Sequence, residues 1–244
     1  VSLSWRPFSE STLRIRASYK DIFRVPTFTD LYYLRMGNTN LKPEETSQYN
    51  VGVTWSSSCG DWLRHFSISA DGYYNTVKDK IVALPTMYVW KMMNMGEVDI
   101  KGVDVNLSTQ FRLPLRMSLL LASTYSFQYA VDVTDPEAKN YKDQIPYTPR
   151  HSGTVSVTLE NPWVNVSYIL TAVGDRYALP QNIDRNRIDS YIEQSISINR
   201  DFRFRYFGLR LQGELLNLAN VNYDVIQYYP MPGRSWRLSI CLSY

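Results

Sequence analysis

Apolar and polar residues alternate along most of this chain, and the pattern is most regular in its last segment. Between Trp236 and Tyr244 every second residue is apolar or aromatic, and the residues between them are small or polar. Successive side chains of a β-strand point to opposite faces, so the pattern predicts a strand with one apolar and one polar face. An aromatic residue at the end of such a strand is typical of a barrel whose apolar face contacts lipid and whose polar face lines a lumen.

The same period of two recurs through the rest of the sequence, beginning with Val1, Leu3 and Trp5. Further segments that show it are residues 13–20, 48–55, 65–71, 103–111, 117–127, 154–159, 164–170, 192–198 and 209–215. Together they predict about eleven strands, and helical periodicity does not prevail over any long window. We therefore expect an all-β protein, an antiparallel transmembrane β-barrel.

The connections between these strands alternate between short and long. The short ones are residues 7–12, 56–61, 112–116, 160–163 and 199–206. The long ones are residues 21–46, 76–97, 129–150, 174–190 and 219–233. Outer-membrane barrels have short periplasmic turns and long extracellular loops, so the first strand is expected to run inward and the last to end at the periplasmic rim.

Aromatic residues gather at both ends of the predicted strands, as in the aromatic girdles of membrane barrels. Those at the short-turn ends are Trp5, Trp55, Trp62, Phe111, Trp163 and Tyr244. Those toward the long-loop ends are Tyr19, Tyr125 and Tyr168. A soluble β-sandwich with aromatic ends is the alternative, but such folds rarely alternate short and long connections so regularly.

An odd number of strands does not suit a bacterial single-chain barrel, because these barrels have even strand counts. The large outer-membrane transporters have 22 strands and a plugged lumen. We therefore expect residues 1–244 to be the C-terminal half of a 22-stranded barrel, unless the count misses one strand.

Composition limits the functional classes. The net charge of +3 and the scattered lysines and arginines give no reason to expect a nucleic-acid partner. Cys59 and Cys241 lack metal-ligand spacing and do not suggest a disulfide framework, so they predict no metal site. No cofactor is expected either. His65 and His151 are predicted at opposite ends of their strands, and no Gly-x-Ser-x-Gly element exists, so we expect no enzyme.

Short motifs occur in series along the chain. The first consists of residues 23–33 and 37–45, with the sequences FRVPTFTDLYY and GNTNLKPEE. The later ones are Gly102-Val103-Asp104, Thr148-Pro149-Arg150-His151, Glu214-Leu215-Leu216-Asn217-Leu218 before Tyr223, and Gly233-Arg234-Ser235-Trp236. In this order they resemble the barrel motifs of TonB-dependent outer-membrane receptors, from which Thr39, Asp104 and Tyr244 are mild departures.

The resemblance implies a protein of the bacterial outer membrane, surrounded by its lipid, that takes up a scarce nutrient with energy from the inner-membrane TonB complex. It also implies an N-terminal plug domain in the same protein, and residues 1–244 contain neither that domain nor a TonB box. The implied ligand is an iron-siderophore, with an oligosaccharide, cobalamin or heme as alternatives. A passive porin or adhesin is the alternative from another class.

Heme is less expected than a siderophore. The family's heme receptors use a histidine between the two halves of the first motif, and this chain has none there. Only Tyr32, Tyr33 and Met36 would serve as axial ligands to the iron.

The first motif contains two corners fixed by proline. The residue before a proline avoids the helical region, so the chain is expected to be extended where this loop leaves and re-enters the rim. We therefore expect a mainly architectural role for Phe23, Arg24, Pro26, Leu41, Pro43 and Glu44.

Candidate ligand contacts lie in the expected outer loops, where aromatic side chains and cations occur together. They are Tyr32, Tyr33, Arg35, Tyr88, Trp90, Lys91, Tyr177, Arg185, Arg187, Tyr228 and Tyr229. Aromatic faces with a few cations suit an anionic, ring-bearing ligand such as a siderophore, and they would also serve a glycan. For any single residue, packing between loops or a place among lipid headgroups is the competing explanation.

Overall fold

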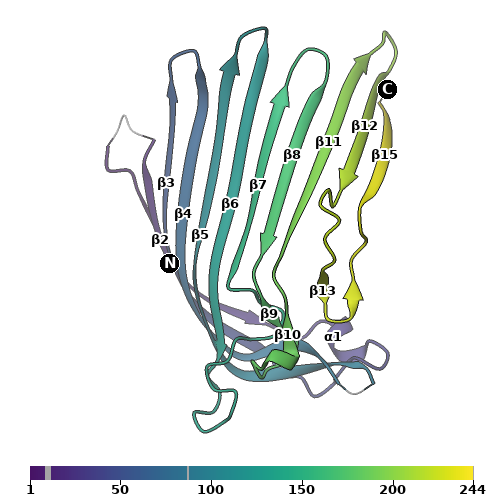
Figure 1. The fold of residues 1–244 in the computed structure, drawn as a ribbon. Helices are drawn as coiled ribbons and strands as arrows, with labels where there is room; N and C mark the ends of the chain where they lie inside the picture. Colours follow the sequence, from purple (N-terminus) through teal and green to yellow (C-terminus); the bar gives the residue numbers. More distant parts are fainter. Residues whose placement is uncertain (9–11, 87, 244) are drawn as a thin grey trace.

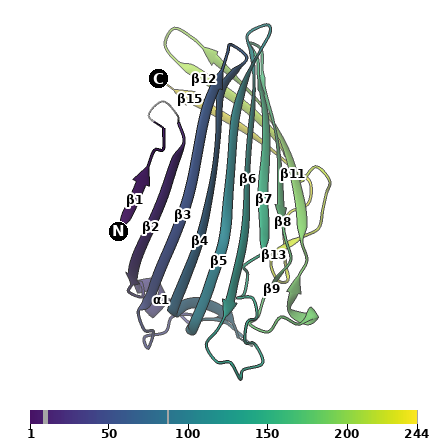
Figure 2. The ribbon, with the colours of Figure 1, turned by 90° about the vertical axis from the view of Figure 1, so that its left-hand side faces the viewer.

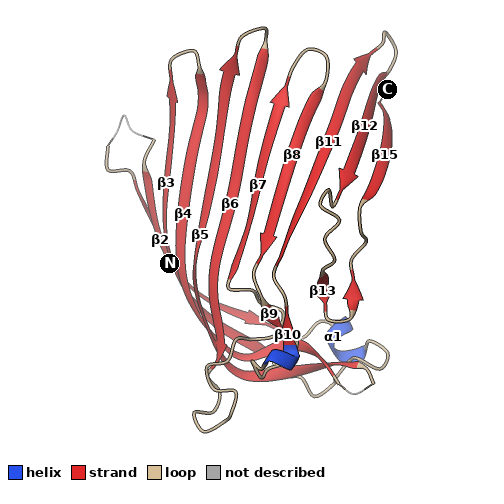
Figure 3. Cartoon of the chain, in the orientation of Figure 1, coloured by secondary structure: helices blue, strands red, loops and turns tan. Residues whose placement is uncertain are grey.

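The computed structural model describes residues 1–8, 12–86 and 88–243, and its main feature is one antiparallel sheet of eleven strands (Figure 1, Figure 3). In sheet order these are β1 (Ser2–Trp5), β2 (Arg14–Arg24), β3 (Glu44–Cys59), β4 (Leu63–Pro85), β5 (Trp90–Leu113), β6 (Met117–Asp132), β7 (His151–Glu160), β8 (Asn165–Val173), β11 (Tyr191–Arg203), β12 (Gly208–Leu216) and β15 (Ser235–Ser243). The expected all-β fold with about eleven strands is confirmed.

The remaining elements lie outside this sheet. They are α1 (Phe28–Tyr32), the 3-10 turn η1 (Asp184–Asn186), the pair β9 (Arg176–Tyr177) and β10 (Arg187–Ile188), and the pair β13 (Asp224–Ile226) and β14 (Tyr229–Pro230). Within the described ranges, no helix is long and apolar enough to cross a membrane.

The sheet curls into a section of a barrel wall (Figure 2). In the part of the chain that the structure describes, β1 and β15 each pair on one side only, so they form the two edges of the sheet. These residues alone therefore leave the barrel open.

Each strand has an apolar face and a polar face, as the alternation predicts. The strand register places Val53, Ala70 and Val105 side by side on the apolar face. On the opposite face, Arg16 of β2 forms an ion pair of 3.0 Å with Asp71 of β4, across the strand that lies between them. Gly52 of β3 makes room for this pair, because a Cβ atom there would collide with the Asp71 carboxylate.

Short turns lie together at one end of the sheet, and α1, β9, β10 and β13 lie at the other end (Figure 1). The predicted alternation of connection lengths is confirmed, with one exception on the long-loop side. The predicted turn at residues 7–12 lies partly outside the described residues.

The exception is the long connection predicted at residues 76–97, which is wrong. Instead, β4 and β5 continue as a paired hairpin, from Lys78 opposite Glu97 to Pro85 opposite Trp90. Asp79, with a φ of 51°, interrupts the regular strand conformation at the point where the alternating pattern fades. The sequence signal for a strand is therefore lost before the strand ends.

Toward the long-loop end, the face that was apolar becomes charged, and the opposite face becomes apolar. On β5, Val103 belongs to the apolar face, but Lys101 and Asp99, farther along the same face, are charged. The opposite face buries a small apolar core there, which consists of Val77, Met95, Val98, Ile100, Ala130 and Ile145. The apolar band on the outside of the sheet therefore ends between Val103 and Lys101.

Aromatic residues lie near both ends of the strands, as expected. At the short-turn end, the ring centroids of Trp62 and Phe111 are 5.7 Å apart. At the long-loop end, those of Tyr19 and Tyr49 are 4.9 Å apart. Tyr244, expected at the periplasmic rim, lies outside the described residues.

Candidate ligand-binding site

The first long connection is held by a network centred on Arg24, at the end of β2. Its Nη2 donates to Asp30 Oδ2 at 3.0 Å, and its Nη1 donates to Glu44 Oε2 at 3.4 Å. Glu44 Oε2 also accepts the backbone N–H of Ile81 at 3.1 Å. Arg24 therefore links the beginning and the end of this loop, and Glu44 links both to β4.

Between these ends, Thr27 caps the short helix α1. Its Oγ1 accepts the backbone N–H of Asp30 at 3.2 Å, and Asp30 Oδ2 accepts the backbone N–H of Thr27 at 2.9 Å. This is the reciprocal arrangement of a capping box. Burial acts to raise the pKa of Asp30, but the hydrogen bonds from Thr27 and the charge of Arg24 outweigh it and leave the pKa below its usual value.

The other residues expected to be architectural differ in their burial. Leu41 is buried and Pro26 is half-buried, whereas Phe23 and Pro43 are exposed. The contacts of Arg24, Glu44 and Leu41 are those that an architectural role requires, and that role remains our proposal for the whole set.

The same loop lies across the extended hairpin of β4 and β5. The backbone N–H of Met92 donates to Met36 O at 2.9 Å. Asn94 accepts the backbone N–H of Lys42 at 2.9 Å and donates to the carbonyl oxygens of Lys42 and Asp79. β4 and β5 extend beyond the apolar band, and the first long loop is hydrogen-bonded to this extension.

A second group of outer contacts surrounds Arg176 of β9, whose side chain is buried. Its Nη2 donates to the backbone oxygens of Asp224 at 2.6 Å and Val225 at 3.1 Å, so it ties β9 to β13. Its guanidinium carbon lies 5.6 Å from the centroid of the Tyr191 ring, which in turn stacks on Tyr223 at 4.1 Å. Its Nη1 is buried and has no hydrogen-bond partner among the described residues.

Tyr147 lies between this group and the β4–β5 hairpin. Its ring centroid is 5.7 Å from that of Trp90, and its backbone N–H donates to Tyr177 O at 2.7 Å. Burial raises the pKa of the Tyr147 hydroxyl, although a backbone hydrogen bond at Gln227 and the charge of Arg176 act in the opposite direction. The hydroxyl therefore stays protonated at neutral pH and can donate a hydrogen bond.

The structure places the predicted ligand contacts in three groups. Tyr32, Tyr33 and Arg35 are exposed on or after α1, and Tyr32 packs on Phe28. Tyr88 is exposed at the tip of the β4–β5 hairpin, and Trp90 and Lys91 begin β5.

The third group lies on the loops that carry η1 and β14. Tyr228 and Tyr229 are exposed, and Arg185 is joined to this loop through its backbone oxygen, which accepts from Gln227 at 3.2 Å. Arg187 lies near Asp175 and Asp189, at 3.5 Å and 3.7 Å. Its charge is therefore partly compensated within the protein.

Sequence reasoning missed four residues that join these groups: Tyr147, Arg176, Tyr191 and Tyr223. The pair Arg176-Tyr177 in a predicted long loop carried a weak signal, since the predicted ligand contacts combine aromatic residues with cations. The contacts between separate loops could not be predicted from the alternation of apolar and polar residues.

The arrangement offers aromatic faces, phenol hydroxyl donors and guanidinium groups at one end of the sheet. Such a surface stacks on rings and donates hydrogen bonds to anionic oxygens. Within the described residues no group of three or more histidine, cysteine, aspartate or glutamate side chains is placed to hold a metal ion. His151 makes a hydrogen bond of 2.9 Å to the Tyr125 hydroxyl through Nδ1, on the apolar face of the sheet.

A family model described as TonB dependent receptor-like, beta-barrel matches residues 1–218. Two curated relatives are vitamin B12 transporters named BtuB. The protein of Photobacterium profundum is 27% identical over 236 residues, covering 93% of this chain and 34% of the relative. The protein of Vibrio vulnificus is 24% identical over 221 residues, covering 88% and 32%. The chain thus spans about a third of the length of these relatives.

Several solved structures share the fold. The ferric citrate transporter FecA in its unliganded form has a TM-score of 0.73 at 12% identity, covering 99% of this chain and 37% of that one. The ferric-catecholate import receptor Fiu from K12 E. coli has a TM-score of 0.70 at 15% identity, with 99% and 34% covered. The copper transporter OprC has a TM-score of 0.71 at 16% identity, with 97% and 37% covered.

Proposed function

The chain belongs to the TonB-dependent receptor β-barrel family of Gram-negative outer-membrane proteins, and from this premise we propose that it forms the outer mouth and part of the wall of a nutrient receptor. The apolar face of the sheet then contacts lipid, and the polar face lines the lumen. The long loops lie outside the cell, where they meet the ligand first.

The proposal treats these eleven strands as the C-terminal half of a 22-stranded barrel. The chain spans about a third of the length of its relatives, so the rest of such a protein would have room for further strands and a plug domain. Energised uptake requires that plug domain and the inner-membrane TonB complex, so both are partners in the proposal.

The observation that carries the proposal is the set of aromatic and cationic side chains at the outer end of the sheet. Trp90, Tyr147 and Tyr177 lie in contact there, Arg176 packs over Tyr191, and Tyr228 is exposed. An anionic, ring-bearing iron chelate fits this chemistry best, because stacking and charge-assisted hydrogen bonds act on it together. We therefore propose a ferric siderophore as the ligand.

Cobalamin is the second candidate, because the two curated relatives are vitamin B12 transporters. Its flat corrin ring would stack on the same aromatic side chains. The two ligands differ in charge, so the cations of the mouth would matter more for a siderophore.

The test is an uptake assay with the full-length protein in cells that lack their own receptors for either ligand. Radiolabelled ferric siderophores and cobalamin are offered separately, with and without a functional TonB complex. Accumulation of a siderophore that requires TonB is the expected result. Binding without accumulation would indicate an adhesin, and accumulation that does not require TonB would indicate a passive pore; either outcome contradicts the proposal.

A further inference from the structure

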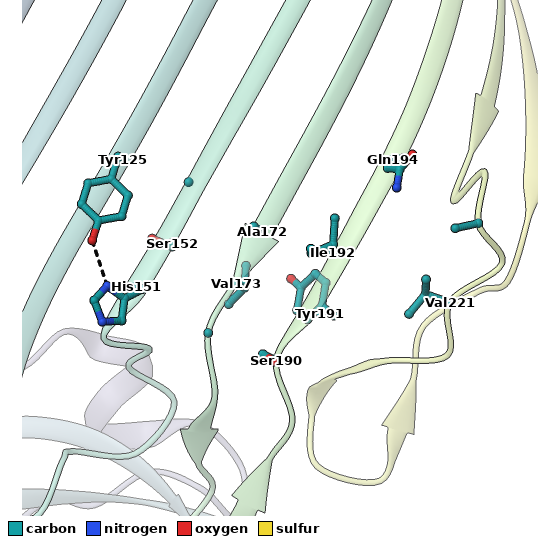
Figure 4. A pocket seen from close by; sticks show the side chains of 13 residues that line it. Tyr125, His151, Ser152, Ala172, Val173, Ser190, Tyr191, Ile192, Gln194 and Val221 are labelled. Atoms are coloured by element: carbon teal, nitrogen blue, oxygen red, sulfur yellow. Dashed lines mark hydrogen bonds between the residues drawn. The ribbon is translucent and has the colours of Figure 1, made fainter.

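A groove of about 680 Å³ lies on the apolar face of the sheet, close to its outer end (Figure 4). Its centre is one row of side chains across four strands, Tyr125 of β6, Gly153 of β7, Ala172 of β8 and Ile192 of β11. Large side chains stand at both ends of this row, and the two smallest residues lie between them. The row is therefore hollow in the middle.

The groove continues toward the long-loop end. Gly174 follows there, with its N–H bonded to His151 O at 2.8 Å, and Ser190 lines the same side. His151 forms one wall with Tyr125, to whose hydroxyl it is hydrogen-bonded, and Val221 lies on the opposite side of the groove (Figure 4). The volume is in the range of pockets that hold small ligands.

The depth of the groove in the membrane follows from the strand register. Tyr125 pairs with Val105, and His151 lies in the row of Val103, where the continuous apolar run of this face on β5 ends. Lys101, the next residue outward on that face, is charged. The floor of the groove is therefore just inside the outer boundary of the hydrocarbon, and its upper end opens at the headgroup level.

Two cations lie at this upper level. The Nζ of Lys101 and the Cζ of Arg150 are each 5.2 Å from the centroid of the Tyr129 ring. Both residues are exposed, and neither forms an ion pair with a carboxylate in the part of the chain that the structure describes. Cations beside a membrane surface attract phosphorylated headgroups.

We propose that this groove binds one acyl chain of an outer-leaflet lipid whose headgroup phosphate is held by Lys101 and Arg150. The occupant is a lipid because the groove is continuous with the face that contacts the membrane. It is an outer-leaflet lipid because the groove opens at the long-loop end. The inference needs only the membrane location and holds for any nutrient.

Ala172→Leu tests the acyl-chain part. The leucine side chain fills the hollow while keeping the face apolar, whereas a Cβ at Gly153 would meet Thr124 O at 3.0 Å and strain the backbone. The matched control is Ala70→Leu, which makes the same change on the same face of β4, away from the groove. Both variants must run as folded barrels by heat-modifiable gel migration, and Ala172→Val, which fills less of the hollow, replaces Ala172→Leu if the leucine prevents folding.

The measurement is native mass spectrometry of the full-length, delipidated receptor titrated with lipid A. We expect one bound lipid per protein, about tenfold weaker binding for Ala172→Leu because several methylene contacts are lost, and no change for Ala70→Leu. Equal binding by Ala172→Leu and the unaltered protein would overturn the proposal. So would an equal loss in the Ala70→Leu control.

Lys101→Gln tests the headgroup part, with Lys139→Gln in the exposed β6–β7 connection as the control. Lipid A carries phosphate in the outer leaflet, and a diacylglycerol, which has acyl chains but no phosphate, serves as the competing lipid. Loss of the Lys101 charge should weaken lipid A binding roughly fivefold and leave diacylglycerol binding unchanged. If the diacylglycerol competes equally with lipid A on the unaltered protein, the headgroup assignment is wrong.

Discussion

Replacing Arg24 with methionine tests whether its ion pairs with Asp30 and Glu44 hold the first outer loop. The Arg24 side chain is 44% exposed, but its partners Asp30 and Glu44 are only 11% and 13% exposed. An exposed ion pair contributes up to about 1 kcal/mol, whereas a buried charge that loses its partner costs about 3–5 kcal/mol. Both carboxylates keep backbone hydrogen bonds, so we expect the free energy for opening this loop to fall by about 2 kcal/mol.

The assay is hydrogen exchange measured by mass spectrometry on the full-length receptor in detergent. A change of about 2 kcal/mol corresponds to roughly 30-fold faster exchange of protected amides in residues 24–44. Exchange in β11 and β12 should not change, because β5, β6, β7 and β8 separate these strands from the network in the sheet order. Methionine preserves the apolar part of the arginine side chain, so lost packing contributes little.

Lys20→Met is the matched control, since Lys20 lies on the same strand and is exposed. It removes the same charge from β2 without touching Asp30 or Glu44. If Lys20→Met accelerates exchange in residues 24–44 as strongly as Arg24→Met, or if neither does, the network does not hold the loop.

Three further predictions concern the outer contacts. Because the pKa of Asp30 is lowered on folding, its stabilising effect is complete above the usual aspartate range and is lost only as the pH falls through the lower folded pKa; rate-corrected exchange of α1 should therefore be constant down to about pH 4 and rise below it, and Asp30→Asn should remove this dependence. Asn94→Ala leaves the Lys42 N–H and C=O without their partners and should destabilise the first loop by about 1–3 kcal/mol, which proteolysis of native protein would detect as faster cleavage there. Arg176→Met should free β13 from β9 and accelerate exchange at Asp224, whereas Arg176→Lys should restore only part of the protection, since an ammonium cannot present the same planar donors.

The strands within the apolar band could be predicted from the sequence because lipid and lumen impose opposite requirements on alternate residues. Val51 and Val53 face outward and are exposed, and Gly52 between them faces the Arg16–Asp71 pair. A shift of one residue would place charge in lipid, so the register is strongly specified. The same constraint explains why the strand count and the other described connections, apart from the one at residues 76–97, could be inferred correctly.

Beyond the band this constraint disappears, and the prediction failed at that point. Lys78 and Glu97 face outward on the β4–β5 hairpin and pair across it at 3.9 Å, while Val77 and Val98 face inward and are buried. Their polarity is the reverse of that within the band. The alternation with an apolar outer face is absent there, so the sequence predicts a loop where the hairpin continues.

The individual candidate site residues could be suggested only by type. Aromatic and cationic residues in the outer connections include Trp90 and Tyr177, both of which the structure places in contact with Tyr147. Arg176 has its partners on a connection about 50 residues away, at Asp224, and such contacts depend on how loops fold against one another. Neither periodicity nor spacing encodes them.

The extension of β4 and β5 also determines which of the candidate ligand-binding residues stand on paired strands. Val98 is fully buried in the small core at the base of the hairpin, and Trp90 at its far end contacts Tyr147. The candidate ligand-binding aromatics of this region therefore stand on paired strands with a packed base, which costs little further ordering when a ligand binds. Tyr88 at the tip and Tyr228 are the most exposed of the candidate tyrosines. We therefore expect the supported residues to determine affinity, and the exposed tyrosines to make the first contact: Trp90→Ala should mainly accelerate ligand dissociation, and Tyr88→Ala should mainly slow association. Stopped-flow binding with the transported ligand separates the two rates, and a loss confined to association for Trp90→Ala would refute the distinction.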